Sequence, residues 1–157
     1  MKYFLTLVLL CAATVFPAVA QELDPETLRQ FEKEARNMRL AYDALTADGI
    51  RNDGGGTMSQ RLVYMPSGTF DLYVLQASIV VASREGAALE DHERICTAIL
   101  ARAADRDPSY AAPVVHAAFA STLGGKRETL EFGSSKFNVQ PIATGYECWT
   151  FHDPGEP

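Results

Sequence analysis

Basic residues are scarce in this chain, and no cluster of them occurs. Lys2 is the one charged residue among the first 20, so residues 21–157 contain 13 basic and 20 acidic residues and carry a net charge of −7. Nucleic acids and anionic membrane surfaces both favour proteins rich in lysine and arginine. We therefore expect no nucleic-acid partner, and no membrane association of residues 21–157.

Recognisable catalytic motifs are also lacking. The chain contains neither G-x-S-x-G nor H-E-x-x-H. The glycine-rich residues 51–59 lack the Gly-Lys-Ser/Thr sequence that a phosphate-binding loop requires. No Asn-x-Ser/Thr acceptor for glycosylation occurs either. These absences favour a protein that is not an enzyme and needs no cofactor. The three consecutive glycines at 54–56 predict that residues 51–59 form a flexible loop.

The amino end has the pattern of a cleavable signal peptide. Lys2 precedes an uncharged apolar run over residues 4–15, and the small residues Ala18 and Ala20 stand at the −3 and −1 positions before Gln21. Signal peptidase accepts small residues at these two positions. We therefore predict a signal peptide over residues 1–20 and cleavage before Gln21.

A membrane anchor is the alternative interpretation of this run. The apolar stretch is at the short limit for crossing a bilayer, and Pro17 interrupts it. Cleavage is therefore favoured, and Cys11 is lost with the leader. The mature chain, residues 21–157, is long enough for one globular domain. We expect it to be exported to a bacterial periplasm or to the extracellular space.

The mature chain retains two cysteines, Cys96 and Cys148. Exported proteins meet an oxidising environment, so we predict a disulfide between these two residues. Closing a loop of this length stabilises a fold by roughly 4 kcal/mol in the chain-entropy model. A zinc site formed by His92, Cys96, Cys148 and His152 is the alternative. It would require a tight turn, because Cys148 and His152 would otherwise stand about 13 Å apart along a strand.

Residues 24–49 have the pattern of a long amphipathic helix. Asp24 and Pro25 suit the N-cap and first helical positions, and Gly49 suits the end. An apolar stripe at helical spacing is predicted to pack on the core, or alternatively to form an exchanged or dimeric helix that would give a homodimer. The stripe consists of Leu28, Phe31, Ala35, Met38, Tyr42 and Leu45.

Two further helices are expected, over residues 87–105 and from Asp107 to Leu123, with Cys96 facing inward and Pro113 kinking the second or marking its first turn. A hairpin is predicted from residues 61–65 and 70–75 around a Pro-Ser-Gly turn. Residues 76–82 fit a strand or a helix equally well.

Short alternating runs over residues 129–132, 137–140 and 146–151 predict an antiparallel meander. The predicted fold class is therefore α+β. Its antiparallel sheet, an N-terminal hairpin plus the C-terminal meander, would pack against about three helices and carry one disulfide. Residues 153–157 are expected to be frayed.

The preferred functional interpretation is a non-enzymatic binding or protein-interaction domain. Aromatic residues on the sheet could line a pocket for a small apolar ligand or form a surface for an unidentified protein partner, and Trp149 is expected to pack against the disulfide. These residues are Tyr64, Phe70, Tyr73, Phe132, Phe137, Tyr146, Trp149 and Phe151.

Two alternatives stay open. The acidic surface would suit a secreted inhibitor or immunity-type protein that covers a basic enzyme face. A small hydrolase with a histidine-centred site is the other. Its candidate histidine, His116, is expected to be a partly buried core residue, and its spacing from Ser121 does not place the two side by side on a helix.

Overall fold

A computed structural model describes residues 24–53 and 60–155. The predicted signal peptide, its cleavage site and most of the glycine-rich segment lie outside these residues. None of the helices described has the combination of length and apolarity needed to cross a bilayer.

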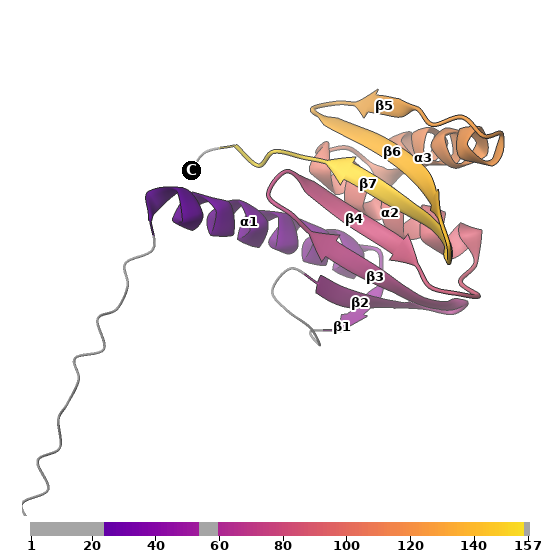
Figure 1. Cartoon of the computed structure of the whole chain (residues 1–157), viewed down its shortest axis with the longest axis horizontal. Coiled ribbons are helices and arrows are strands. Elements are labelled where there is room, and N and C mark those ends of the chain that lie inside the picture. Colours follow the sequence, from indigo (N-terminus) through magenta and orange to yellow (C-terminus); the bar gives the residue numbers. More distant parts are fainter. Residues whose placement is uncertain (1–23, 54–59, 156–157) are drawn as a thin grey trace, which may run out of the picture.

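Strands of the described chain form one antiparallel sheet of seven strands, in the order β1-β2-β3-β4-β7-β6-β5 (Figure 1). The N-terminal hairpin and the C-terminal meander meet where β4 pairs with β7. The predicted α+β fold class is therefore confirmed. The strands are β1 (Arg51–Asp53), β2 (Gln60–Met65), β3 (Gly68–Val74), β4 (Ser78–Ser83), β5 (Thr129–Phe132), β6 (Ser135–Ile142) and β7 (Gly145–Phe151).

Three helices cover one face of this sheet and leave the other face open (Figure 1). They are α1 (Pro25–Ala47), α2 (Leu89–Ala103) and α3 (Pro108–Leu123). Helix α1 contacts the β1, β3 and β4 side, α2 lies over β4 and β7, and α3 lies over β5 and β6. The core lies between this helical layer and the sheet.

The ends of two helices follow the predicted capping pattern. The Asp24 carboxylate accepts hydrogen bonds from the backbone N–H groups of Glu26 and Thr27, at 3.1 and 3.0 Å. Asp107 caps α3 in the same way. Beyond α1, Gly49 has a φ of 68°, the left-handed conformation that commonly ends a helix. Pro113 lies inside α3 rather than in its first turn.

Two segments of the N-terminal half needed the structure for their assignment. Residues 78–83 form β4, and the turn before it separates it from β3, which resolves the strand-or-helix ambiguity of residues 76–82. All six residues of β4 are buried, in agreement with the apolar composition of a central strand. Arg51–Asp53 were predicted to belong to a loop, but they pair with β2 as an edge strand.

The prediction for the apolar stripe of α1 is wrong in part. Leu28, Phe31 and Tyr42 keep 46, 48 and 55% of their surface exposed. The buried face is rotated from the stripe and is made by Asn37, Ala41, Ala44 and Leu45. A polar residue thus occupies a position that apolar periodicity alone would assign to solvent.

Hydrogen bonding of Asn37 explains this rotation. Its side-chain amide donates to the carbonyl oxygens of Leu75 and Gln76, at 3.0 and 3.1 Å, and lies 3.4 Å from that of His152. These carbonyls belong to the turn before β4 and to the segment after β7. The amide group of this fully buried asparagine supplies donors that these carbonyls need, although its Oδ1 accepts no hydrogen bond from the described residues.

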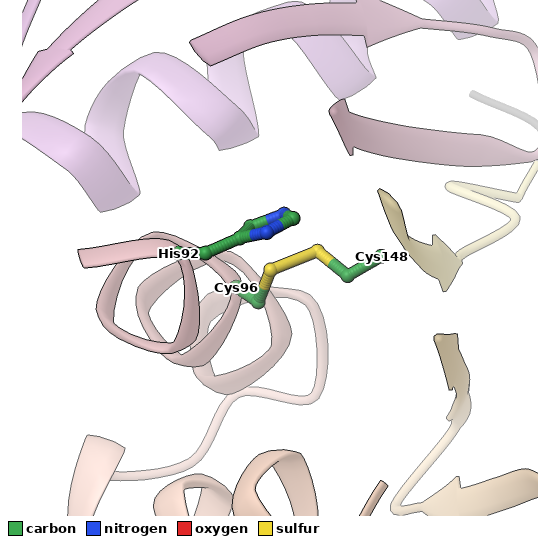
Figure 2. A group of neighbouring side chains, drawn as sticks. All are labelled: His92, Cys96 and Cys148. Carbon is green, nitrogen blue, oxygen red and sulfur yellow. A yellow bond between two sulfur atoms is a disulfide. The ribbon is translucent and has the colours of Figure 1, made fainter. Parts of the chain in front are cut away.

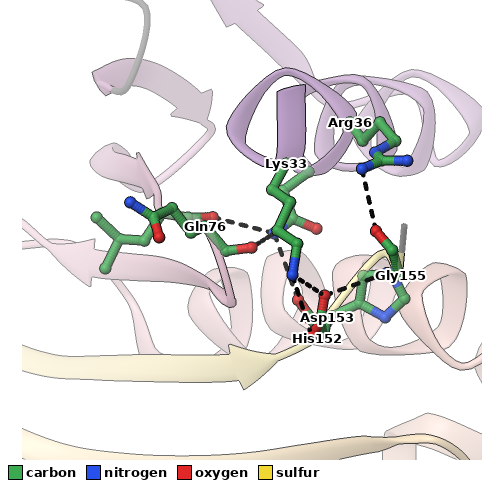
Figure 3. A network of polar contacts seen from close by, with 8 residues as sticks. Lys33, Arg36, Gln76, His152, Asp153 and Gly155 are labelled. Carbon is green, nitrogen blue, oxygen red and sulfur yellow. Dashed lines mark hydrogen bonds and ion pairs between the residues drawn. The ribbon is translucent and has the colours of Figure 1, made fainter. Parts of the chain in front are cut away.

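The segment after β7 is held against α1 (Figure 3). Lys33 forms an ion pair with Asp153 at 3.0 Å, and the Arg36 guanidinium donates to the carbonyl of Gly155 at 3.0 Å. The prediction of a frayed tail is therefore wrong for residues 153–155. Residues 156–157 lie outside the described part.

Candidate functional site

The predicted disulfide is confirmed. Cys96 on α2 and Cys148 on β7 are bonded, with an S–S distance of 2.07 Å. Both residues are buried, with 0 and 1% of their surface exposed. The bond therefore crosses the core and joins the helical layer to the centre of the sheet.

One turn before Cys96, His92 lies over this disulfide (Figure 2). Its Nε2 is 2.9 Å from the carbonyl oxygen of Val81. A carbonyl can only accept, so Nε2 carries the proton in the neutral ring and Nδ1 does not. Burial lowers the pKa of His92 from 6.5 to about 4, against a smaller opposing effect of the hydrogen bond to Val81.

The rings of Phe70 and Phe119 flank His92, at centroid distances of 5.2 and 5.1 Å. His92 is therefore enclosed by the core, with 1% of its surface exposed. This residue is a neutral component of an aromatic core.

Three of the four residues of the alternative zinc site do converge. The ligand atoms of His92, Cys96 and Cys148 all lie within 4.8 Å of one another. His152 is not part of this group; it follows β7, and its backbone N–H donates to Ala77. Zinc binds thiolates, whereas the two sulfurs here are bonded to each other. The oxidised cluster is thus a core crosslink with a histidine beside it.

The three histidines occupy separate environments. His116 was expected in the core but is exposed, and its Nδ1 lies 3.3 Å from the Glu93 carboxylate. His152 is half-buried, and burial lowers its pKa. Among the described residues, no histidine ring is hydrogen-bonded to a hydroxyl or a thiol. The arrangement therefore does not assemble a histidine-activated nucleophile in this part of the chain.

The aromatic residues of the sheet divide between its two faces, because successive strand residues point in opposite directions. Phe70, Phe132, Phe137 and Tyr146 belong to the core side or pack against it. Tyr64, Tyr73, Trp149 and Phe151 share the helix-free face by their strand register.

The expected packing of Trp149 on the disulfide is wrong for the same reason. Cys148 points toward the helices, so its neighbour Trp149 points away from them. Trp149 instead stacks on Phe151 with a centroid distance of 5.9 Å and donates from Nε1 to Glu147 at 3.0 Å.

A groove of about 520 Å³ lies between α1 and the β1–β3 end of the sheet. Its α1 wall consists of residues of the apolar stripe that the core covers only in part or not at all. Polar residues of α1, β1 and β2 and an apolar residue of β3 complete the lining. The lining residues are Ala35, Met38, Arg39, Tyr42, Asp43, Asn52, Arg61 and Leu72.

Arg61 is the unusual residue of this groove. It lies on β2 opposite Leu72 of β3. Its side chain is on the same side of the sheet as that of the fully buried Val63, two residues further along the strand. Its Nε atom is buried and has no hydrogen-bond partner among the residues that the structure describes. A guanidinium keeps its charge in proteins, so this position places a cation inside a groove that also has an apolar wall.

A second hollow of about 520 Å³ lies between α2 and α3. Most of its charged groups have partners within the protein: Arg94 pairs with Asp48 at 2.7 Å, and His116 contacts Glu93. Charges that are already paired leave less for a ligand to gain. The groove beside α1 is therefore the stronger candidate for a binding site.

Sequence reasoning missed this groove, although one signal for it was present. Alternation along Arg61, Val63 and Met65 places an arginine on the inward face of a strand, where an apolar residue is the usual choice. No protein family, curated protein or solved structure matches this chain. Functional assignment therefore depends on the chemistry of the groove itself.

Proposed function

We propose that the protein is an exported, non-enzymatic binding protein that holds a small, largely apolar ligand in the groove between α1 and the sheet. The observation that carries this proposal is the exposed apolar wall that α1 presents to the groove. Met38 and Tyr42 are large side chains that the folded core leaves partly or largely in water.

The physical gain comes from covering this wall. Removing apolar surface from water contributes about 25 cal/mol per Å². The groove volume lies within the range of small-molecule sites, which are commonly mostly apolar with a few polar groups that orient the ligand. Leu72 lines the floor, and Asn52 and Arg61 supply polar groups of this kind.

The helix-free face of the sheet supports ligand binding less well. Tyr64 and Phe151 are exposed there, but an open sheet face does not enclose a small molecule. Its Asp71 and Arg84 form a two-pronged ion pair with both distances at 2.8 Å, which lowers the pKa of Asp71. A protein partner or a second copy of the chain on this face is the alternative that the experiment below separates from the groove.

Export is supported by two features. The residue pattern of positions 1–20 is that of a signal peptide. A buried disulfide is compatible with an oxidising compartment. Together these features favour a ligand that the protein meets in the periplasm or outside the cell.

Binding of the uncharged fluorescent probe N-phenyl-1-naphthylamine tests the proposal. The variant Tyr42→Ala removes an exposed ring from the groove wall, so we expect about tenfold weaker binding, equivalent to about 1.4 kcal/mol. Tyr110→Ala is the matched control, because Tyr110 is an exposed tyrosine of α3 outside the groove. We expect it to bind like the unmodified protein.

Two results would overturn the proposal: no saturable binding of the probe, or equal affinity for both tyrosine variants. Light scattering provides the comparison with the alternative. A stable dimer that does not bind the probe would favour a protein-interaction role.

A further inference from the structure

We infer that the ligand of this groove is an amphipathic anion, a carboxylate with an alkyl or aromatic tail, and that its charged end pairs with Arg61. This inference rests on the proposed function and adds the chemical class of the ligand. It follows from the combination, in one groove, of an apolar wall with an arginine whose side chain has no partner among the residues that the structure describes.

Arg61 differs from three arginines that are paired with aspartates. Arg84, Arg94 and Arg102 each lie within 4.0 Å of an aspartate. The Arg61 side chain has no hydrogen bond or ion pair with any residue in the described part of the chain, and its Nε is buried. Keeping a cation partly out of water without a partner costs free energy. An anionic ligand would remove that cost.

The orientation of Arg61 is determined by the backbone of β2. Its partner across the sheet is Leu72, which is 2% exposed and forms part of the groove floor. The register therefore directs the arginine toward the helical layer, not toward the open face. A guanidinium in this position offers two parallel N–H donors, the geometry that a carboxylate matches.

The rest of the groove is also divided between polar and apolar residues. Arg39 adds a second cation, and Asn52 adds an amide. Asp43, the one acidic residue among the described lining residues, lies 4.0 Å from Arg102 of α2. Ala35, Met38 and Tyr42 supply the apolar wall along α1. A molecule with a negative head and an apolar tail satisfies both parts, whereas an uncharged hydrocarbon leaves Arg61 unpaired.

Displacement of N-phenyl-1-naphthylamine by three ligands of equal chain length tests this inference: dodecanoate, dodecan-1-ol and dodecylamine. We expect dodecanoate to bind at least tenfold more tightly than the other two. Arg61→Met keeps the unbranched side chain but removes the charge. It should raise the Kd for dodecanoate roughly 10- to 100-fold and change the Kd for dodecan-1-ol less than about twofold.

Arg127→Met is the matched control, because Arg127 is exposed before β5 and lies outside the groove. It should leave all three affinities unchanged. Arg61→Lys is the second variant, since it keeps the charge but loses the two-pronged donor geometry. We expect it to restore part of the preference for dodecanoate. Near-ultraviolet circular dichroism of each variant confirms that it is folded before titration.

The possible failures are distinguishable. Equal affinity for dodecanoate and dodecan-1-ol, or an Arg61→Met variant that retains the preference for dodecanoate, would overturn the anion inference and leave the proposed function intact. Absence of probe binding by the unmodified protein would overturn the proposed function itself.

Discussion

Reduction of the Cys96–Cys148 disulfide is the perturbation whose effect on stability can be calculated most directly. The two cysteines are separated by 52 residues. In the chain-entropy model, opening a loop of this length allows the unfolded chain enough additional freedom to lower the free energy of unfolding by about 4 kcal/mol. Reduction keeps both sulfur atoms in the core, so it tests the crosslink without creating a large cavity.

A loss of about 4 kcal/mol is a large part of the 5–15 kcal/mol that stabilises a typical domain. With a urea m-value of about 2 kcal/mol per M, the unfolding midpoint should fall by about 2 M. Urea titrations of the oxidised and fully reduced protein measure this difference, with a free-thiol count in each state as the control.

The rate at which a thiol reductant reduces the disulfide is a second test of its burial. Both cysteines are buried, so a thiol reductant should reach them only when the protein opens. We expect the rate of reduction in native buffer to follow the unfolding rate. Rapid reduction in native buffer, or a midpoint shift below about 0.5 M, would refute the conclusion that this crosslink lies in the core and stabilises it.

Protonation of His92 should destabilise the fold in acid. Its pKa in the folded protein, about 4, lies below its ordinary value of 6.5. The free energy of unfolding should therefore be highest above pH 6.5 and should decrease by roughly 3 kcal/mol as the pH falls toward 4. Urea titrations should show this change in the unmodified protein but not in His92→Phe, and parallel pH curves would contradict it. Export predicts that the full-length chain, expressed in a bacterium, is recovered outside the cytoplasm with Gln21 as its first residue; mass spectrometry that finds Met1 in the recovered protein would argue against cleavage.

Local patterns predicted much of the fold. Aspartate-proline pairs marked the starts of α1 and α3, and alternating runs indicated the meander. The disulfide followed from the two cysteines that remain after residue 20, in a chain predicted to be exported. These features depend on residues close in sequence, or on a pairing with no competing partner.

Features that depend on distant contacts were harder to predict. The buried face of α1 is determined by Asn37, whose hydrogen-bond acceptors lie 38 or more residues away in sequence. The groove exists because this orientation of α1 leaves Tyr42 exposed and Met38 only partly covered by the core. The direction of Trp149 required the register of β7 against β4, which places Cys148 opposite Val81 on the helix side.

The central claim is that the groove beside α1 binds an amphipathic anion through Arg61, and nuclear magnetic resonance tests it most directly. On titration with dodecanoate, we predict that the largest chemical-shift changes occur at the Arg61 side-chain Nε–H, at Met38 and at Leu72, while the Trp149 indole N–H is unaffected. The largest changes at Trp149 and Phe151, with an unaffected Arg61, would contradict the claim.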